Sequence, residues 1–174
     1  AYVLHGAKYV VDSGYKFDGE RVQKGLNWLQ KYFKEPDVVK ASKNLDSTTN
    51  NNWYEHTTDD LTYACYVYAL YGWKNDEILT NLYNRKTTLS NEALAYLSLA
   101  YAELNKKDKA EELLDTLVSR VDVALPIVSF GMSQKLLEKF GLSLAPLYSY
   151  NEVEISAIVL RAMLKVRPND PIID

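Results

Sequence analysis

Apolar positions recur every three to four residues in seven segments of the chain, which is the spacing of one face of a helix. These segments cover residues 1–13, 18–34, 58–73, 76–84, 91–104, 107–121 and 151–166. No segment alternates apolar and polar residues convincingly with a period of two, so we predict no strands. The pattern therefore predicts an all-α protein.

Capping residues mark most of the predicted helix starts, because a side-chain oxygen there accepts hydrogen bonds from the first free backbone N–H groups. The candidates are Asp18, Asn75, Ser90 and either Thr57 or Thr58. At the last helix, Asn151 with Glu154 and Ser149 with Glu152 both fit a capping box. The last helix is therefore expected to begin at about Asn151.

Two stretches lack the helical pattern. Residues 41–56 are rich in Asn, Ser and Thr, and residues 125–150 contain prolines and glycines. These residue types favour turns over regular structure. We predict loops in both stretches, with a short helix at 133–140 interrupting the second.

The predicted helices are of two kinds. Residues 61–70 carry no charge, residues 93–102 carry none either, and residues 155–164 carry only Arg161. Helices this apolar, to which the first helix also belongs, must be covered on all sides. The intervening helices are amphipathic, with apolar faces made of Val22, Leu26, Leu29 and Phe33 in one and Ala110, Leu113, Leu114, Leu117 and Val121 in another. Buried and amphipathic helices thus alternate.

The buried helices also resemble one another, which indicates a repeat of helix pairs. Small residues recur five positions apart as Ala1 and Gly6, Ala64 and Ala69, Ala95 and Ala100, and Ala157 and Ala162. Such pairs stack either into an open superhelix of the tetratricopeptide kind or into a closed α/α toroid. The apolar inner helices and the uneven spacing of the repeats favour a partial α/α toroid, with an inner apolar ring and an outer amphipathic ring.

Composition narrows the class of protein. The chain has 174 residues, enough for one domain, of which 47% are hydrophobic and 25% charged. Its net charge of −3 provides no basic surface for nucleic acid. No apolar run reaches the roughly 20 residues of a membrane span, and no signal-peptide pattern is present. The sequence predicts a soluble helical domain without nucleic-acid binding.

Both ends of the sequence are abrupt. Residue Ala1 leads directly into an apolar helix without a cap, and Asp170-Pro171 has the form of a helix start that is followed by three residues. We therefore expect residues 1–174 to be a single fragment of one domain, truncated at both ends.

Four segments carry patterns that occur together in a known family. Residues 1–5 with 22–29 form the first helix pair, 61–70 the next inner helix, 93–117 a second pair and 147–164 the last helix. In order and spacing these segments resemble the thioester-containing domain of the α-2-macroglobulin and complement family, in the form found in bacterial members. The resemblance covers essentially the whole chain and implies an α/α toroid.

The resemblance also implies a chemistry. Family members form an internal thioester between a cysteine and a glutamine of a Cys-Gly-Glu-Gln-like motif, and proteolysis exposes it to acylate a protease or a surface. Here Cys65 is followed by Tyr66, Val67 and Tyr68, so the motif is absent from this chain. Cys65, the single cysteine, lies in an apolar segment and is expected to pack in the core.

Two histidines are the remaining candidates for chemistry. Some family members use a histidine after the second helix to attack the thioester, and His56 lies at the end of the corresponding loop. It stands closer to Asp59 than the family pattern implies, which favours an ordinary loop residue. His5 is expected to be a core histidine. His56 is thus a weak catalytic candidate.

Other signals have plain explanations. No phosphate-binding loop, zinc motif or serine-hydrolase motif occurs. Asp59 and Asp60 resemble half of the acidic pairs of prenyl-transferring toroids, but acidic residues also favour a helix N-terminus. The 14 tyrosines could line a ligand cavity, although those of residues 61–71 face all sides of one helix. We expect no cofactor, no metal and no enzymatic activity.

Three functions remain open. The leading one is a role in protease trapping or covalent surface attachment within an extracytoplasmic α-2-macroglobulin-like protein, whose partners are target proteases and neighbouring domains. The second is a toroidal enzyme, such as a cyclase, prenyltransferase or polysaccharide lyase, which a His-Tyr-Arg cluster would favour. The third is a helical scaffold for protein interactions. A cut ring also predicts an exposed apolar edge and dimerisation.

Overall fold

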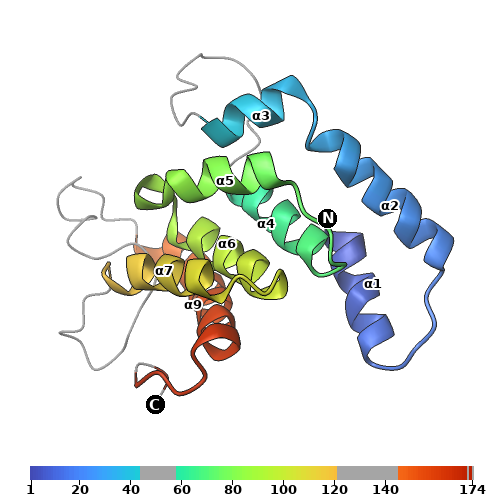
Figure 1. Cartoon of the computed structure of the whole chain (residues 1–174). Coiled ribbons are helices and arrows are strands. Elements are labelled where there is room, and N and C mark those ends of the chain that lie inside the picture. The colour runs from blue at the N-terminus through green and yellow to red at the C-terminus, as the bar shows by residue number, and fades with distance from the viewer. Residues whose placement is uncertain (44–57, 121–144, 172, 174) are drawn as a thin grey trace.

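The computed structural model describes residues 1–43, 58–120, 145–171 and 173, and these residues form helices and connecting turns without strands (Figure 1). The helices are α1 (Tyr2–Asp12), α2 (Gly19–Tyr32), α3 (Pro36–Lys43), α4 (Thr58–Ala69), α5 (Asp76–Asn84), α6 (Asn91–Glu103), α7 (Lys107–Val118) and α9 (Ala145–Val166), with a 3₁₀ turn at Lys86–Thr88. The predicted all-α class is confirmed for the described residues.

The helices are arranged in two layers. Four of them, α1, α4, α6 and α9, form an inner row in that order, with α4 packed on α6 and α6 packed on α9. The others cover this row from one side: α2 contacts α1 and α4, α5 contacts α3 and α6, and α7 contacts α6 and α9. In Figure 1 the blue helices α1 and α2 lie at one end of the molecule and α7 and α9 at the other.

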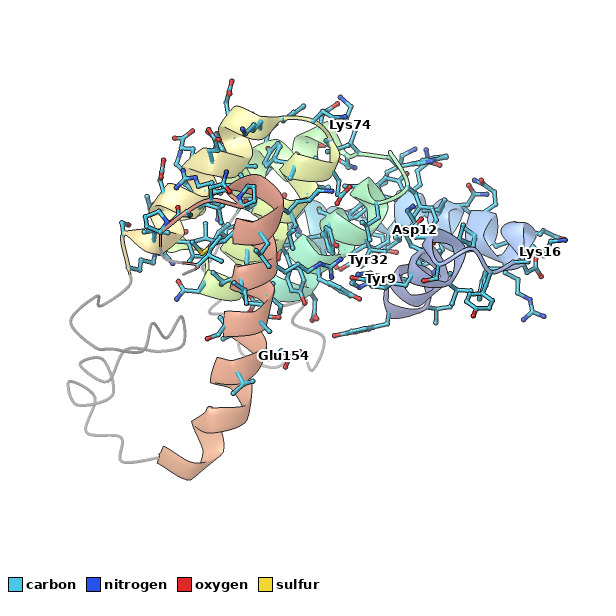
Figure 2. The ribbon with its side chains drawn as sticks, turned by 90° about the horizontal axis from the view of Figure 1, so that it is seen from below. Tyr9, Asp12, Lys16, Tyr32, Lys74 and Glu154 are labelled. Carbon is cyan, nitrogen blue, oxygen red and sulfur yellow. The ribbon has the colours of Figure 1, made fainter. Side chains whose placement is uncertain are left out.

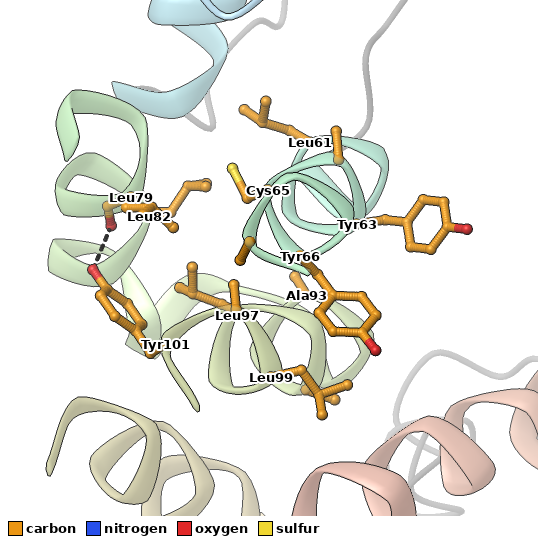
Figure 3. Packing of buried hydrophobic residues seen from close by; sticks show 14 of the residues in the cluster. Leu61, Tyr63, Cys65, Tyr66, Leu79, Leu82, Ala93, Leu97, Leu99 and Tyr101 are labelled. Carbon is orange, nitrogen blue, oxygen red and sulfur yellow. Dashed lines mark hydrogen bonds between the residues drawn. The ribbon is translucent and has the colours of Figure 1, made fainter. Parts of the chain in front are cut away.

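The core lies where α4 meets α6 (Figure 3). Every residue from Leu61 to Ala69 is buried, and most of α6 is buried as well. Two hydroxyl groups tie α6 to the outer layer: Tyr101 donates to the backbone carbonyl of Leu79 at 3.0 Å, and Ser98 donates to that of Ala110 at 2.9 Å. The middle of the inner row is therefore enclosed, as the absence of charges predicted.

The outer helices bury most of the faces that their patterns predict; Val22 is half-buried, and Val121 lies outside the described residues. In α2 the buried side chains include Leu26 and Leu29, with Phe33 directly after the helix. In α7 they are Ala110, Leu113, Leu114 and Leu117. Gly25 lets α2 approach α1 closely, because a Cβ there would lie 2.9 Å from a methyl group of Leu4.

The predicted caps Asp18, Asn75 and Ser90 are confirmed. Their side chains accept hydrogen bonds from backbone N–H groups in the first turns of α2, α5 and α6. Two inner helices end in the same way, with Gly72 (φ 75°) after α4 and Asn105 (φ 56°) after α6 in the left-handed conformation. This turn closes the last carbonyls of each helix and leads the chain back to the outer layer.

The prediction of a loop from residue 41 is wrong for its first three residues, because α3 extends from Pro36 to Lys43. The second helix ends before Pro36 as predicted, but Pro36 also begins a new helix, because proline fits the first helical turn, where its missing N–H has no partner to lose. Ser42 donates to the carbonyl of Val39, and Asn81 of α5 donates to Ser42 at 2.9 Å, which fixes α3 on α5. The remainder of the predicted loop lies outside the described residues.

The last helix begins at Ala145, six positions before the predicted start at Asn151. Both capping boxes are therefore wrong, since Ser149 and Asn151 lie inside the helix. Pro146 was assigned to an irregular stretch, but it stands in the first helical turn, where it breaks no hydrogen bond. The short helix predicted at 133–140 lies outside the described residues, and α4 ends at Ala69 rather than near Trp73.

The prediction that all inner helices are covered on every side is wrong for α1 and α9. Tyr2 and Val3 of α1 are each 78% exposed, and Val153 of α9 is 72% exposed. Figure 2 shows the first turns of α9 projecting beyond the other helices. The reason is position: α1 and α9 end the row, so among the described helices α1 packs on α4 and α9 on α6, and the two end helices meet only through a few side chains.

Candidate binding site

The predicted site residues fall in different places. His56, the catalytic candidate, lies outside the described residues. Cys65 is buried in the middle of α4, and burial raises the pKa of its thiol, which keeps it protonated and unreactive. Asp59 and Asp60 lie in the first turn of α4, as the helix-dipole interpretation predicts.

His5 is more than a core histidine, because it connects α1 to two other inner helices. It is half-buried, and its Nδ1 lies 2.9 Å from the hydroxyl of Tyr63 on α4. Its Nε2 lies 3.5 Å from a guanidinium nitrogen of Arg161 on α9. Because arginine can only donate, the contact favours the tautomer with the lone pair on Nε2 and with Nδ1–H donating to Tyr63. This assignment follows from the neighbouring groups and corresponds to a neutral imidazole.

Aromatic rings surround the Arg161 guanidinium. Its central carbon lies 5.2 Å from the ring centroid of Tyr9 on α1 and 5.3 Å from that of Tyr66 on α4. Figure 2 shows Tyr9 on the side of α1 that faces the middle helices. Both contacts lie within the range of cation–π attraction. We call His5, Tyr9, Tyr63, Tyr66 and Arg161 the tyrosine–arginine cluster.

The cluster changes the acidity of its own members. Burial lowers the pKa of His5, and the positive charge of Arg161 lowers it further. Burial raises the pKa of Tyr63 to about 12, with smaller effects from Tyr2 and Tyr9 and an opposing one from Arg161. At neutral pH the cluster therefore holds one positive charge, on Arg161, beside a neutral imidazole and neutral phenols.

Acidic side chains lie next to the cluster without pairing with its arginine. Glu92 of α6 is half-buried; burial raises its pKa, and the carboxylates of Asp59, Glu154 and Asp60 raise it further. Glu92 and Glu154 also act on Tyr96, whose ring lies 5.0 Å from that of Tyr63. The inner face therefore carries a cationic region at the cluster and an acidic region near the starts of α4 and α6.

Sequence reasoning did not bring the cluster together. The charge of Arg161 stood out in an otherwise apolar helix, and His5 in another, which is a signal that the two share a polar site. The pairing itself depends on how α1, α4 and α9 pack, which no local pattern encodes. In the described residues no group of three or more His, Cys, Asp or Glu side chains could hold a metal ion.

Comparison with known proteins adds no identification. No family model, no curated protein and no solved structure matches the chain. The described helices also include none with the length and apolar character of a membrane span.

Proposed function

We propose that the chain is part of the thioester-type domain of an extracytoplasmic α-2-macroglobulin-like protein, where it contributes to protease trapping or surface attachment. The observation that carries the proposal is the pair of apolar flanks at the ends of the inner row, with Tyr2 and Val3 on α1 and Val153 on α9. In a closed α/α toroid, further inner helices would cover both flanks. Target proteases and neighbouring domains would be its partners.

The middle of the row supports the same proposal. A ring that carries an acylating group needs a rigid wall that does not compete with it for nucleophiles. The α4–α6 core meets this need, because Cys65 is buried and its thiol is held in the protonated form. The chain would thus be a supporting part of the trap, and the reactive cysteine would belong to another part of the protein.

Intact mass of the full-length protein before and after methylamine treatment tests the proposal. Methylamine attacks a thioester carbonyl, forms an amide and releases the cysteine as a thiol. We expect the mass to rise by one methylamine and one new thiol to become titratable. A folded full-length protein without either change would contradict a thioester role.

The Cys65→Ser variant of the full-length protein is the matched control. Because Cys65 has no part in the proposed thioester, this variant should gain methylamine as fully as the wild type. A second measurement tests trapping directly: a trapped protease keeps its activity on small peptides and loses it on large proteins. Loss of methylamine uptake in Cys65→Ser would show that Cys65 has been assigned wrongly.

The apolar flanks lead to a test on this chain alone. If they are the edges of a ring, the isolated chain should dimerise or aggregate through them. Replacing Tyr2 and Val3 by serine should reduce the average mass measured by light scattering. The matched control is Tyr15→Ser, which removes an exposed tyrosine outside α1. A wild-type chain that stays monomeric at high concentration would contradict the ring edge.

The tyrosine–arginine cluster favours a second candidate function, a toroidal enzyme acting on an anionic polysaccharide. In such an enzyme Arg161 would hold a sugar carboxylate, and a neutral His5 could accept a proton. The raised pKa of Tyr63 argues against a tyrosinate base. Incubation with uronate-containing polysaccharides tests it, because elimination would produce shorter chains with unsaturated ends. Unchanged chain length would contradict a catalytic role of the cluster.

A plain interaction scaffold is the third candidate function, and evenly spaced repeats in the full-length protein would support it.

A further inference from the structure

Arg161 differs from the other arginines of the chain in what its guanidinium contacts. Within the described residues it forms no ion pair, and its polar contact is the long one to His5. Each of the four other arginines contacts oxygen: Arg21 that of Asp18, Arg85 two carbonyls of α3, Arg120 three carbonyls and Asn91, and Arg167 that of Asp115 and a carbonyl. The buried Nε and Nη2 of Arg85 have no partner within the described residues, but its Nη1 donates to both carbonyls. Arg161 therefore has donor groups left for an acceptor that the described chain does not supply.

Tyr66 provides a second polar group without a partner. Its side chain is fully buried, and its hydroxyl makes no hydrogen bond within the described part of the chain. Figure 3 shows the Tyr66 ring pointing from α4 toward α9, the helix that carries Arg161. A buried hydroxyl left without a partner is unfavourable, and it calls for an acceptor at the same place.

The cluster is open to solvent on the α1 side. His5 and Arg161 are half-buried, and Tyr9 is 48% exposed. An external group can therefore reach a cation that is partly shielded from water, where a charge-assisted hydrogen bond is stronger than at an open surface.

We propose that the tyrosine–arginine cluster is a binding site for a carboxylate carried on a ring. Arg161 donates to the carboxylate, the Tyr66 hydroxyl donates to one of its oxygens, and the exposed rings of Tyr9 and Tyr2 contact the face of the ligand. The ligand ring can be aromatic or a sugar, because both offer a flat face to tyrosine. This inference is independent of the thioester proposal.

A carboxylate fits the site better than other anions. Planar guanidinium groups match planar carboxylates through two parallel hydrogen bonds. A phosphate carries more charge and is commonly held by several cations or by a helix N-terminus. This cluster has one cation, the carboxylate of Glu103 acts on Tyr66, and those of Glu92 and Glu154 act on the neighbouring Tyr96. The cluster therefore fits a ligand with a single negative charge and an apolar or sugar face.

The experiment follows the histidine signals of the 174-residue chain by NMR. The chain has two histidines, so His5 and His56 are assigned with one His56→Gln variant. The probes are benzoate, glucuronate and acetate, with benzamide and glucose as the uncharged matches and inorganic phosphate as a different anion. We expect benzoate or glucuronate to shift the His5 signal in a saturable way and to leave His56 unchanged. The probe that binds more tightly shows whether the ring of the ligand is aromatic or a sugar.

Bound carboxylate should also raise the pKa of His5, because it neutralises the charge that Arg161 places beside the imidazole. Arg161→Gln should abolish both effects, and Tyr66→Phe should weaken binding about threefold to tenfold while the fold is kept. The matched control is Lys165→Gln, which removes a positive charge from the same helix outside the cluster.

Three results would overturn the inference. The first is no saturable shift of His5 with benzoate or glucuronate. The second is an equal shift in Arg161→Gln, with circular dichroism showing that this variant is folded. The third is that another probe binds as strongly as benzoate or glucuronate. Equal binding of acetate would show that the ring is not recognised, and equal binding of phosphate or of the uncharged probes would show that the carboxylate is not. The wild-type titrations alone decide the first and the third.

Discussion

The middle helices α4 and α6 and the end helices α1 and α9 belong to the same inner row, and their sequences are similarly apolar. All residues from Leu61 to Ala69 in α4 are buried, whereas α1 buries Leu4 and Ala7 and exposes much of its remaining surface. An apolar sequence therefore indicates that a helix must be buried by neighbouring helices. The position of the helix in the row decides whether the described chain supplies those neighbours.

The comparison also explains where the polar groups lie. The end helices supply His5, Tyr9 and Arg161, and the middle helix α4 supplies Tyr63 and Tyr66. A charged side chain inside the α4–α6 contact would be cut off from water at high cost. The cluster forms at the border, where side chains from the partly covered helices reach the covered ones.

The largest expected difference between the two regions is in the cost of removing a leucine. Leu97 of α6 is fully buried, and Leu164 of α9 is 49% exposed. Leu97→Ala should lower the free energy of unfolding by about 2–5 kcal/mol, because it leaves a cavity. Leu164→Ala should change it by about 0.5 kcal/mol or less. Urea unfolding followed by circular dichroism measures both, and equal costs would break the comparison.

Two tyrosines test the same contrast through hydrogen bonds. Tyr101→Phe removes the donor to the Leu79 carbonyl and should cost about 1–3 kcal/mol. Tyr66→Phe removes a hydroxyl that has no partner within the described residues, and it should leave the free energy of unfolding unchanged or raise it. The same unfolding measurement applies. A large loss in Tyr66→Phe would mean that its hydroxyl is bonded in solution.

The start of a middle helix gives a smaller effect. The Ser90 side chain accepts a hydrogen bond from the N–H of Ala93 at 2.9 Å, so Ser90→Ala should cost about 1 kcal/mol. Ser90→Asn keeps an acceptor at this position and should retain most of the stability. Both variants lack the serine side chain, but only Ser90→Asn keeps a side-chain acceptor at the helix start. Equal thermal midpoints for both would mean that the cap contributes little.

The smallest expected effect concerns pH and the contact between the end helices. Because the pKa of His5 is lower in the folded chain than its ordinary value of 6.5, the unfolded chain binds this proton more readily. The contribution of neutral His5 to the free energy of unfolding is therefore complete above about pH 6.5 and is lost as the pH falls below this value.

Urea unfolding at about pH 7.5 and pH 5.5 measures this dependence, on either side of the ordinary pKa of histidine. The wild type should lose more stability on acidification than His5→Gln does. His56→Gln should behave like the wild type if His5 is the group responsible. An identical loss in His5→Gln would remove His5 as the cause.

Local signals in the sequence predicted much of the fold. Charge-free stretches identified α4 and α6, and single polar residues marked the caps at Asp18, Asn75 and Ser90. The errors are helix starts at prolines: the break before Pro36 is correct, but the helix α3 that begins there was not predicted, and Pro146 lies in the first turn of α9 rather than in an irregular stretch. A proline is compatible with a helix start and with a helix end, and the sequence around it did not distinguish the two.

The candidate site could not be predicted to the same extent. His5 and Arg161 are 156 positions apart, and their contact depends on the packing of three helices. The sequence showed a histidine in one apolar segment and a lone arginine in another, but it did not show that they face each other. His56, a weak catalytic candidate on the basis of a resemblance, lies outside the described residues and stays a prediction.

The single thiol of the chain allows the rate at which the buried middle of the row opens to be measured. Cys65 is buried beneath residues of α4 and its neighbours, and a thiol reagent can reach it only after that region opens. Figure 3 shows Cys65 on the side of α4 that faces α5, so the reagent reaches the thiol when the outer layer separates from α4. The rate at which Cys65 is alkylated under native conditions therefore reports this opening, without any label or substitution.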